Sequence, residues 1–398
     1  MSLSPSVAVL ASRALPVGRY MPGRGAAGAV LEHERLADVV LAALGDAGVA
    51  PREVGALLFT ANPPPTLQLG FAPFFASRLG ISAQAQMLEV SALGATGAAA
   101  FDLAVNEVRL GHTEVAVALG VHFESQAATA EAMAAGIRAV GDVDFQSVYG
   151  LTPIAWYALD AARYCHDSGA TRRDLAAVAV KSREFARRNP LAQLRDPLSL
   201  EAVLAAPPIV EPLGLFDVPA RGDGAVCIVV GSERRARSGA RIEVAGRGYA
   251  HDGHHQMGMT PHSMTRLPAA RQAASRAMAT AGLTLDALDV LELYAPCTIT
   301  EVLVTEALGL FAQGHGASAA LEGRTGPGGD RPVNTSGGCL SRGHPSSITG
   351  LYGLHEVVEQ LQHHAGERQL PGARVGLALA EGGNYNTALA HCLVREEA

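Results

Sequence analysis

The sequence predicts an α/β fold built from two related halves, because a helix–turn–strand unit occurs twice along the chain. The two copies are LADVVLAALGDAGVAPREVGALLFTAN and AARQAASRAMATAGLTLDALDVLELYAPC. Each combines apolar residues at helical spacing, a glycine that ends the helix (Gly48 or Gly282), a polar turn and a short apolar strand. A repeat of this size predicts two half-domains related by a pseudo-twofold axis.

A second pair of matching stretches supports the duplication. GATGAAAFDLA, which starts at Gly94, resembles SITGLYGLHEV, which starts at Ser347, and in both stretches small residues open a helix. Each helix is followed by an apolar strand that ends near glycines, EVAVALG in the first copy and RVGLALAEGG in the second. Two ordered matches in succession favour duplication over chance.

The two halves are expected to meet near residue 240, in the charged turn SERRARSGARIEV between two strands. This boundary divides the chain into an N-terminal half, 1–240, and a C-terminal half, 241–398. The stretch of about 123–215 has no counterpart in the other half. It contains helical patterns such as TPIAWYALDAARY and is expected to form a helical insertion over one face of the molecule.

Composition limits the partners and the compartment. The chain has 398 residues, a net charge of −7 and no basic stripe, so nucleic acid is not expected as a partner. No apolar run approaches the roughly 20 residues of a membrane span, and no signal peptide is recognisable. Scattered cysteines without a C-x-x-C pair indicate free thiols. We therefore expect a cytoplasmic protein that does not bind membranes.

The glycine-rich stretch NTSGGCLSRGHPSSITG, from Asn334 to Gly350, raises three alternatives: a phosphate cradle, half of a metal site, or a holder for a catalytic imidazole. It lacks the P-loop pattern, and His344 has only His355 near it in sequence, so no metal site is expected. A denser group of histidines is expected to lie in a solvated loop: His251, His254, His255 and His262. The remaining alternative is a turn whose glycines let the backbone approach a ligand while His344 donates to a developing oxyanion.

These residues carry a resemblance to a known family. NTSGGCLSRGHPSSITGLYGLHEVVEQL resembles the G-H-P motif of thiolases. LYAPCTITEVLVTEALGL resembles the H-D-C-F loop of sterol-carrier-type thiolases and the Y-D-x-F-T loop of thiolase-like aldolases. The similarity covers nearly the whole chain. It implies a five-layered αβαβα thiolase fold with the helices after Gly94 and Ser347 at its centre, and a homodimer formed through edge strands of the first half.

The chain departs from that family at the nucleophile. Thiolases carry a C-x-[ST]-G motif at the start of a buried helix, and here the motif reads Gly94-Ala95-Thr96-Gly97. Glycine has no side chain, so an acyl-cysteine cannot form at this position. The C-terminal cysteine of degradative thiolases is also missing, and Tyr385 lies beside the glycines of that strand end, LAEGGNYNTA.

The resemblance implies roles for four catalytic residues. His344 would hold the oxygen of an acyl-CoA enolate, and Cys297 would protonate the enolate carbon. Tyr294, in place of the leading histidine of the H-D-C-F loop, or Tyr385 would move a hydroxyl proton. Each has a simpler interpretation, with Cys297 as a small core residue and the tyrosines as space-filling side chains. The expected substrate-binding residues are Gly94, Thr96, Asn334, Gly337, Gly338 and Gly383.

The function expected from this site is aldol-type cleavage or formation of a carbon–carbon bond in a 3-hydroxyacyl-CoA, without an acyl-cysteine intermediate. Two alternatives stay open: an acyltransferase or decarboxylase of a biosynthetic pathway, and a non-catalytic scaffold subunit of a heteromeric thiolase complex. The CoA thioester would be the substrate, and no cofactor is expected. The resemblance also implies a separate partner protein made of a zinc ribbon and an OB-fold.

Overall fold

The structure is a computed structural model of the chain. It describes residues 6–20, 32–61, 70–124, 140–142, 144, 146–236, 240–252 and 264–397. The first part of the expected insertion, 125–139, and most of the histidine-rich stretch, 253–263, lie outside these residues.

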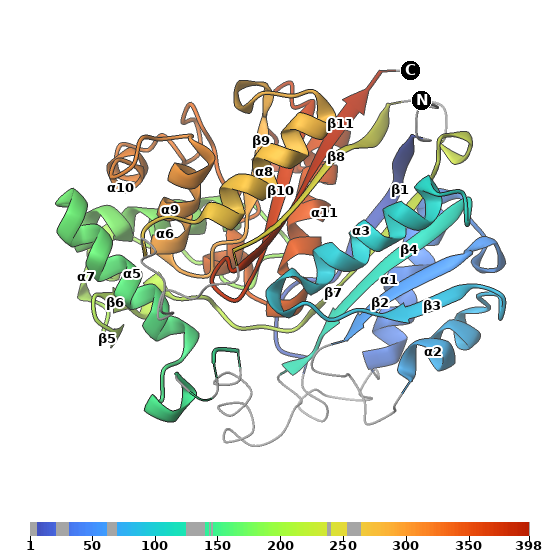
Figure 1. The fold of residues 1–398 in the computed structure, drawn as a ribbon, viewed down its shortest axis with the longest axis horizontal. Helices are drawn as coiled ribbons and strands as arrows, with labels where there is room; N and C mark the ends of the chain where they lie inside the picture. The colour runs from blue at the N-terminus through green and yellow to red at the C-terminus, as the bar shows by residue number, and fades with distance from the viewer. Residues whose placement is uncertain are drawn as a thin grey trace.

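Nine hydrogen-bonded strands form the sheet framework, in the order β3-β2-β4-β7-β1-β8-β11-β10-β9 (Figure 1). The strands are β1 (Val7–Ala14), β2 (Ala56–Ala61), β3 (Gln86–Glu89), β4 (Val115–His122), β7 (Gly224–Ser232), β8 (Arg241–His251), β9 (Val290–Leu293), β10 (Val375–Gly382) and β11 (Thr387–Glu396). Apart from β3, the two halves of the sheet mirror each other: β2, β4, β7 and β1 in the first half correspond to β9, β10, β11 and β8 in the second. The pairs β2–β4 and β9–β10 are parallel, and the pairs that follow them toward the centre are antiparallel.

A short antiparallel contact between β1 and β8 joins the two half-sheets, with Ala8 opposite Glu243 and Val9 opposite Ile242. β7 ends at Ser232 and β8 begins at Arg241, so the charged turn lies between these two strands, as the sequence predicts. The mirrored strand order around β1 and β8 gives the two halves their pseudo-twofold relationship.

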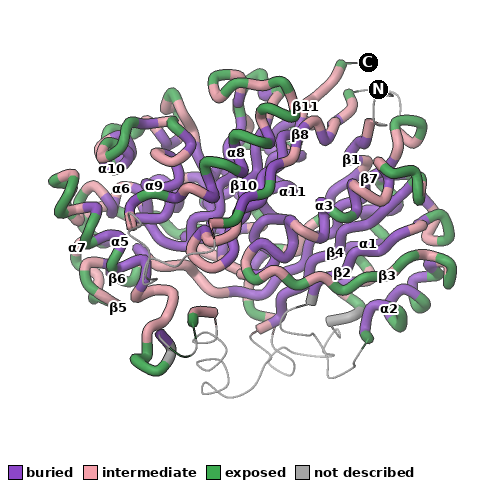
Figure 2. The backbone as a smooth tube through the Cα atoms, in the orientation of Figure 1, coloured by how far each residue is buried: buried purple, intermediate pink, exposed green. Residues whose placement is uncertain are grey.

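Three apolar clusters define five layers. The helices that build them are α1 (Glu32–Ala47), α2 (Phe71–Leu79), α3 (Thr96–Arg109), α8 (Pro268–Ala281), α9 (Thr298–Leu308) and α11 (Thr349–Gln362). α1 and α2 cover the outer face of the first half-sheet, α3 and α11 fill the space between the half-sheets, and α8 and α9 cover the outer face of the second. Alternate residues of β2 point to opposite clusters, Leu57 outward and Leu58 inward. Figure 2 shows the central strands and α11 as buried.

Small residues let the two central helices approach each other. A Cβ atom at Gly97 of α3 would lie 2.9 Å from Leu351 Cγ, and a Cβ atom at Gly350 of α11 would lie 3.1 Å from Ala98 Cβ. Real Cβ atoms rarely make such close contacts, so glycine is required where the helices meet. The prediction that the helices after Gly94 and Ser347 lie together at the centre is confirmed.

The helix–turn–strand repeat is also present. α1 leads to β2 in the first half and α8 leads to β9 in the second. Gly48 and Gly282 follow these helices, and both have a φ of +66°, in the left-handed region that glycine adopts without steric cost.

The described part of the insertion contains α5 (Pro153–Ser168), α6 (Arg172–Ala186), α7 (Leu200–Ala205), β5 (Pro208–Val210) and β6 (Leu213–Gly214). These elements pack against the second half of the chain, on α9 and on α10 (Gly316–Leu321), at the left of Figure 1. Lys181 of α6 forms a buried ion pair with Glu301 of α9 at 2.7 Å. The insertion therefore covers the C-terminal half and brings its side chains to that half's site. Among the described helices, none has the length and apolar character that crossing a membrane requires.

Candidate active site

The glycine-rich turn is fixed by close backbone contacts. It contains a one-turn π-helix, Gly338–Arg342, which is followed by Gly343 with a φ of +114°. A Cβ atom at Gly343 would lie 2.4 Å from Val17 Cγ1. The backbone N–H of His344 donates to Ala220 O at 2.7 Å. This turn places the imidazole just before α11, as expected for an imidazole holder.

His344 is paired with Tyr294. The Tyr294 hydroxyl lies 2.7 Å from His344 Nε2 and donates to Ser346 O at 3.2 Å. A hydroxyl has one proton, and when that proton is donated to Ser346 O, the hydroxyl oxygen accepts from an Nε2–H group. Desolvation lowers the pKa of His344 to about 3, so the imidazole is neutral at physiological pH. A neutral imidazole with a protonated Nε2 is a hydrogen-bond donor suited to an enolate oxygen.

A charged cluster from the first half lies next to this pair. Arg221 binds Glu124 through two hydrogen bonds of 2.8 and 2.6 Å. His122, at the end of β4, lies 3.3 Å from Glu124 and 3.0 Å from the Ser347 hydroxyl. Burial raises the pKa of Glu124, but the hydrogen bonds with His122 and Arg221 outweigh it and lower that pKa to about 2. The cluster therefore carries a fixed carboxylate beside the His344 turn.

Tyr385 is buried in the turn between β10 and β11, and its hydroxyl donates to the backbone carbonyl oxygen of Tyr294. Its backbone N–H donates to Glu381 Oε2 at 2.8 Å, while Tyr157 of α5 donates to Glu381 Oε1 at 2.9 Å. Burial raises the pKa of Glu381 to about 8. The structure therefore brings Tyr294, Tyr385 and His344 together, and it adds Glu381 and Tyr157, which the sequence analysis missed.

Gly94 lies in the turn before α3, directly beside Tyr294. A Cβ atom at Gly94 would lie 2.9 Å from the Tyr294 hydroxyl and 2.6 Å from Glu381 O. Thr96 is fully buried, and its hydroxyl accepts from Ala92 N at 2.7 Å and donates to Leu93 O at 2.6 Å. The Thr96 hydroxyl therefore stabilises the turn that carries Gly94.

Cys297 is fully buried at the N-terminus of α9. Burial raises the pKa of its thiol well above the usual value, and the nearby carboxylates of Glu381 and Asp217 add to this effect. The thiol is therefore protonated at neutral pH, which disfavours nucleophilic attack and leaves its proton available for transfer.

The other expected substrate-binding residues differ in their surroundings. Asn334 donates to Glu301 at 2.8 Å and accepts from Leu293 N at 2.7 Å, so its side chain joins β9 to α9. Gly337 packs against Ala186 of α6. Gly338 lines a small pocket together with Tyr294. Gly383 lies in the turn before Tyr385 with a φ of +61°.

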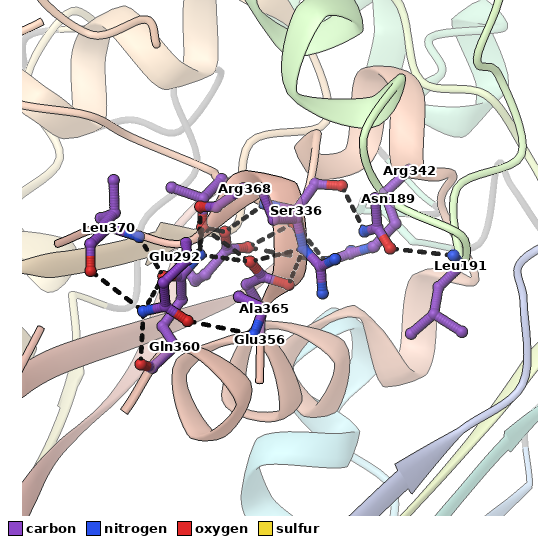
Figure 3. A network of polar contacts seen from close by, with 12 residues as sticks. Asn189, Leu191, Glu292, Ser336, Arg342, Glu356, Gln360, Ala365, Arg368 and Leu370 are labelled. Carbon is purple, nitrogen blue, oxygen red and sulfur yellow. Dashed lines mark hydrogen bonds and ion pairs between the residues drawn. The ribbon is translucent and has the colours of Figure 1, made fainter. Parts of the chain in front are cut away.

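A buried polar network supports the glycine-rich turn from behind (Figure 3). The Ser336 hydroxyl donates to Glu292 at 2.7 Å and accepts from Arg342 at 3.2 Å. In the same network, Arg368 forms an ion pair with Glu356 of α11 at 2.9 Å. Burial and the Glu356 charge raise the pKa of Glu292 to about 7. The sequence contained one signal of this network, since Glu292 interrupts the apolar strand VLEL.

Comparisons with known proteins agree with this architecture. The thiolase N-terminal domain model matches residues 7–200, and the thiolase C-terminal domain-like model matches residues 248–395. An acetyl-CoA acetyltransferase of Methanothermobacter thermautotrophicus is 32% identical over 77% of this chain and 79% of its own length. A steroid side-chain-cleaving aldolase of Thermomonospora curvata is 30% identical over 90% of this chain and 91% of its own length.

A solved structure titled "Ltp2-ChsH2(DUF35) aldolase" superimposes with a TM-score of 0.82 and 26% identity, and the match covers 98% of both chains. The match therefore extends over both half-domains and the described part of the insertion. From its two domain matches, its fold and its full-length relatives, this chain belongs to the thiolase superfamily, in the branch of sterol-carrier-type thiolases and thiolase-like aldolases.

Proposed function

We propose that this chain is a thiolase-like lyase that cleaves a 3-hydroxyacyl-CoA by a retro-aldol reaction, through an acyl-CoA enolate and without an acyl-cysteine. The proposal rests on what lies at the position where thiolases carry their nucleophile. Gly94 offers no nucleophile there, and the Tyr294 hydroxyl, paired with His344, lies beside the vacant Cβ position. The similarity to a steroid side-chain-cleaving aldolase supports this chemistry.

The reaction assigns one task to each group. The bond between C2 and C3 breaks, and its electron pair moves to C2 to give an enolate whose charge lies on the thioester oxygen. His344 donates its Nε2–H to that oxygen in place of the Tyr294 hydroxyl, which is worth about 10²–10³ in rate for one preorganised donor. The C3 hydroxyl proton passes to Tyr294 or Tyr385 as C3 becomes a carbonyl. C2 takes up a proton from Cys297, and the proton released by the C3 hydroxyl restores the Cys297 thiol, so the protein ends the turnover in its starting protonation state.

The state of the tyrosines bears on this proton transfer. Burial raises the pKa of both Tyr294 and Tyr385 well above the usual value. Each is therefore a neutral hydroxyl at physiological pH, so for each proton that a tyrosine accepts from the substrate, its own proton moves on to restore the Cys297 thiol. The hydrogen bond from Tyr385 to the backbone carbonyl oxygen of Tyr294 and the contact between the Tyr294 hydroxyl and His344 hold both hydroxyls in place for this exchange.

The direct test is incubation with a panel of 3-hydroxyacyl-CoA esters, followed by mass spectrometry of both products. We expect equal amounts of a carbonyl compound and a shortened acyl-CoA. Thiolysis of acetoacetyl-CoA without cleavage of any 3-hydroxyacyl-CoA would instead establish an acyltransferase.

Three further properties belong to this proposal. The solved structure whose title names both Ltp2 and ChsH2(DUF35) supports a separate partner protein, for which we propose the zinc-ribbon and OB-fold type, so the assay is run with and without co-purifying protein. The proposed substrate is a CoA thioester, and the proposed reaction requires no cofactor. We place the enzyme in the cytoplasm, in the breakdown of lipid-derived acyl groups.

The proposed homodimer is supported by the outer edge of the first half-sheet. β3 has no strand on its outer side among the described residues, and Leu88 in it is 42% exposed. Phe74 of α2 and Leu93 after β3 are also exposed. An edge strand flanked by exposed apolar side chains is suited to pairing with a second copy. Light scattering at micromolar concentration should give the mass of a dimer, and a monomer would contradict this proposal.

A further inference from the structure

Two hydrogen bonds connect helix α5 of the insertion to the turn that carries Tyr385. Tyr157 donates to Glu381 at 2.9 Å, and Asn384 donates to Asp160 at 3.2 Å. Tyr157 and Asp160 lie one helical turn apart on α5, and Glu381 and Asn384 lie at the end of β10 and in the turn after it. The insertion of the first half is thereby attached to the catalytic turn of the second half.

The turn between β10 and β11 needs such support. Asn384 and Tyr385 have φ values of +54° and +60°, in the left-handed region that residues other than glycine seldom adopt. Backbone of this kind persists only where surrounding contacts hold it. Tyr385 is held at both ends, by its N–H on Glu381 and by its hydroxyl on Tyr294 O. Glu381 is therefore the link between the Tyr385 backbone and the insertion.

Three of the four residues that form this link are buried and Asn384 is half-buried, so water competes little for the Tyr157–Glu381 hydrogen bond. Glu381, Asp160 and Tyr157 are 3%, 1% and 6% exposed. Glu381 interacts electrostatically or by hydrogen bonds with six titratable residues around it. They come from α5, the ends of β9 and β10, the start of α9 and the glycine-rich turn: Tyr157, Asp160, Tyr294, Cys297, Cys339 and Tyr385.

We propose that α5 is a positioning element of the active site, in which Tyr157 orients the Glu381 carboxyl group and Glu381 holds Tyr385 in its catalytic geometry. This inference rests on the proposed lyase function and deepens it, because it makes the insertion a part of the catalytic centre. Tyr157 and Glu381 are positioning residues in this account, since they act through Tyr385.

The chain offers a matched control on the same helix. Tyr164 of α5 donates to Glu306 of α9 at 2.6 Å, which is the same kind of tyrosine–carboxylate hydrogen bond away from the Tyr385 turn. We expect Tyr157→Phe to lower kcat about tenfold with little change in KM, because it loosens a catalytic group without removing substrate contacts. Tyr164→Phe should leave both constants within about twofold of the wild type. Equal kcat values for the two variants would overturn the proposal.

The pH profile gives a readout that a purely structural role would not change. The pKa of Glu381 is raised to about 8, and a negative charge there opposes the enolate, so activity should fall as the pH rises through about 8. Glu381→Gln keeps both hydrogen bonds, since its amide oxygen can accept from Tyr385 N–H and its NH₂ can donate to Tyr157, but it cannot ionise. This variant should lose the fall in activity at alkaline pH, which is the alkaline limb of the profile.

Tyr157→Phe should move this alkaline limb to higher pH, because the Tyr157 hydrogen bond lowers the Glu381 pKa. An alkaline limb unchanged in both variants would overturn the proposal.

Hydrogen–deuterium exchange of the segment 382–387 tests the link independently of activity. Exchange should be faster in Tyr157→Phe than in the wild type and unchanged in Tyr164→Phe. Faster exchange in Tyr157→Phe, combined with no cleavage of any 3-hydroxyacyl-CoA by the wild type, would support the link and overturn the proposed function. Unchanged exchange in Tyr157→Phe would overturn the link whatever the activity.

Discussion

The hydroxyl of Tyr294 lies 2.9 Å from the position that a Cβ atom would take at Gly94. A side chain at residue 94 and the tyrosine hydroxyl therefore compete for the same space. The resemblance places the thiolase nucleophile at residue 94, and in this chain a hydroxyl paired with His344 lies there. The absence of a side chain at Gly94 is thus required by the position of Tyr294.

Substitution of Gly94 should damage the site and should not restore a nucleophile. A Cβ atom at this position would also lie 2.6 Å from the backbone oxygen of Glu381, which cannot move away as a flexible side chain could. We expect Gly94→Ala and Gly94→Cys each to lower lyase activity by about 10²-fold, through displacement of Tyr294. Steady-state kinetics measures this loss, and intact-protein mass spectrometry of Gly94→Cys with acetyl-CoA should show no adduct.

The matched control is Gly45→Ala in α1, where nothing lies within 4 Å of the added Cβ atom. Alanine is favoured over glycine in a helix by about 1 kcal/mol, so this variant should be fully active and slightly more stable. A fully active Gly94→Ala would show that the close contacts at Gly94 do not constrain the site.

The Tyr294–His344 pair should behave as a hydrogen-bonding unit that does not titrate near neutral pH. We expect His344→Ala to lower kcat by about 10²-fold, because it removes a donor to the enolate oxygen. With the His344 pKa lowered to about 3, the kcat profile should have no inflection near pH 6.5. An inflection at that pH in the wild type, lost in His344→Ala, would instead identify the imidazole as a titrating acid or base.

Cys297 should be inert as a nucleophile. It is fully buried and its thiol pKa is raised, so almost no thiolate exists at pH 7. Incubation of the native protein with acetyl-CoA should leave its intact mass unchanged. A stable acetyl adduct mapped to Cys297 would return the protein to the acyltransferases. Cys297→Ala should retain the C2–C3 cleavage step and slow protonation at C2.

Stability should fall at mildly acidic pH because of a histidine that is neutral in the folded protein. Desolvation lowers the pKa of His355 to about 3, and the ring lies 2.8 Å from the Ser12 hydroxyl. Below pH 6.5 the unfolded chain binds a proton that the folded chain does not, so stability is lost as the pH falls from 6.5 toward 3. From pH 7 to pH 5 we expect a loss of about 2 kcal/mol from this residue. Urea unfolding of His355→Gln, which keeps a partner for Ser12, should show a smaller loss than the wild type, and equal losses would contradict this assignment.

The elements predicted from sequence are those whose signals are local. The α1–β2 and α8–β9 repeats, each with its glycine, and the turn around His344 are encoded in short continuous stretches. A motif shows which residues gather but not which hydrogen bonds they make, so the sequence does not indicate the bonds that Thr96 and Asn334 make within the protein.

The contact between Tyr157 and Glu381 had no such signal. It joins residues 224 positions apart, from an insertion without a repeat and a strand that reads as apolar. Contacts of this kind depend on how the insertion packs on the second half of the chain, which no local pattern specifies. For the same reason, the raised pKa of Glu381 follows from burial that appears only in the folded protein.

In the proposed reaction, C–C cleavage passes through an enolate and leaves nothing attached to the protein. This is tested by a single-turnover reaction of a cleaved 3-hydroxyacyl-CoA in D₂O, with mass analysis of both the shortened acyl-CoA and the intact protein. We predict that the first-formed acyl-CoA contains one deuterium at C2 and that the protein mass stays constant throughout the turnover. A transient increase in protein mass equal to the acyl group would contradict the account.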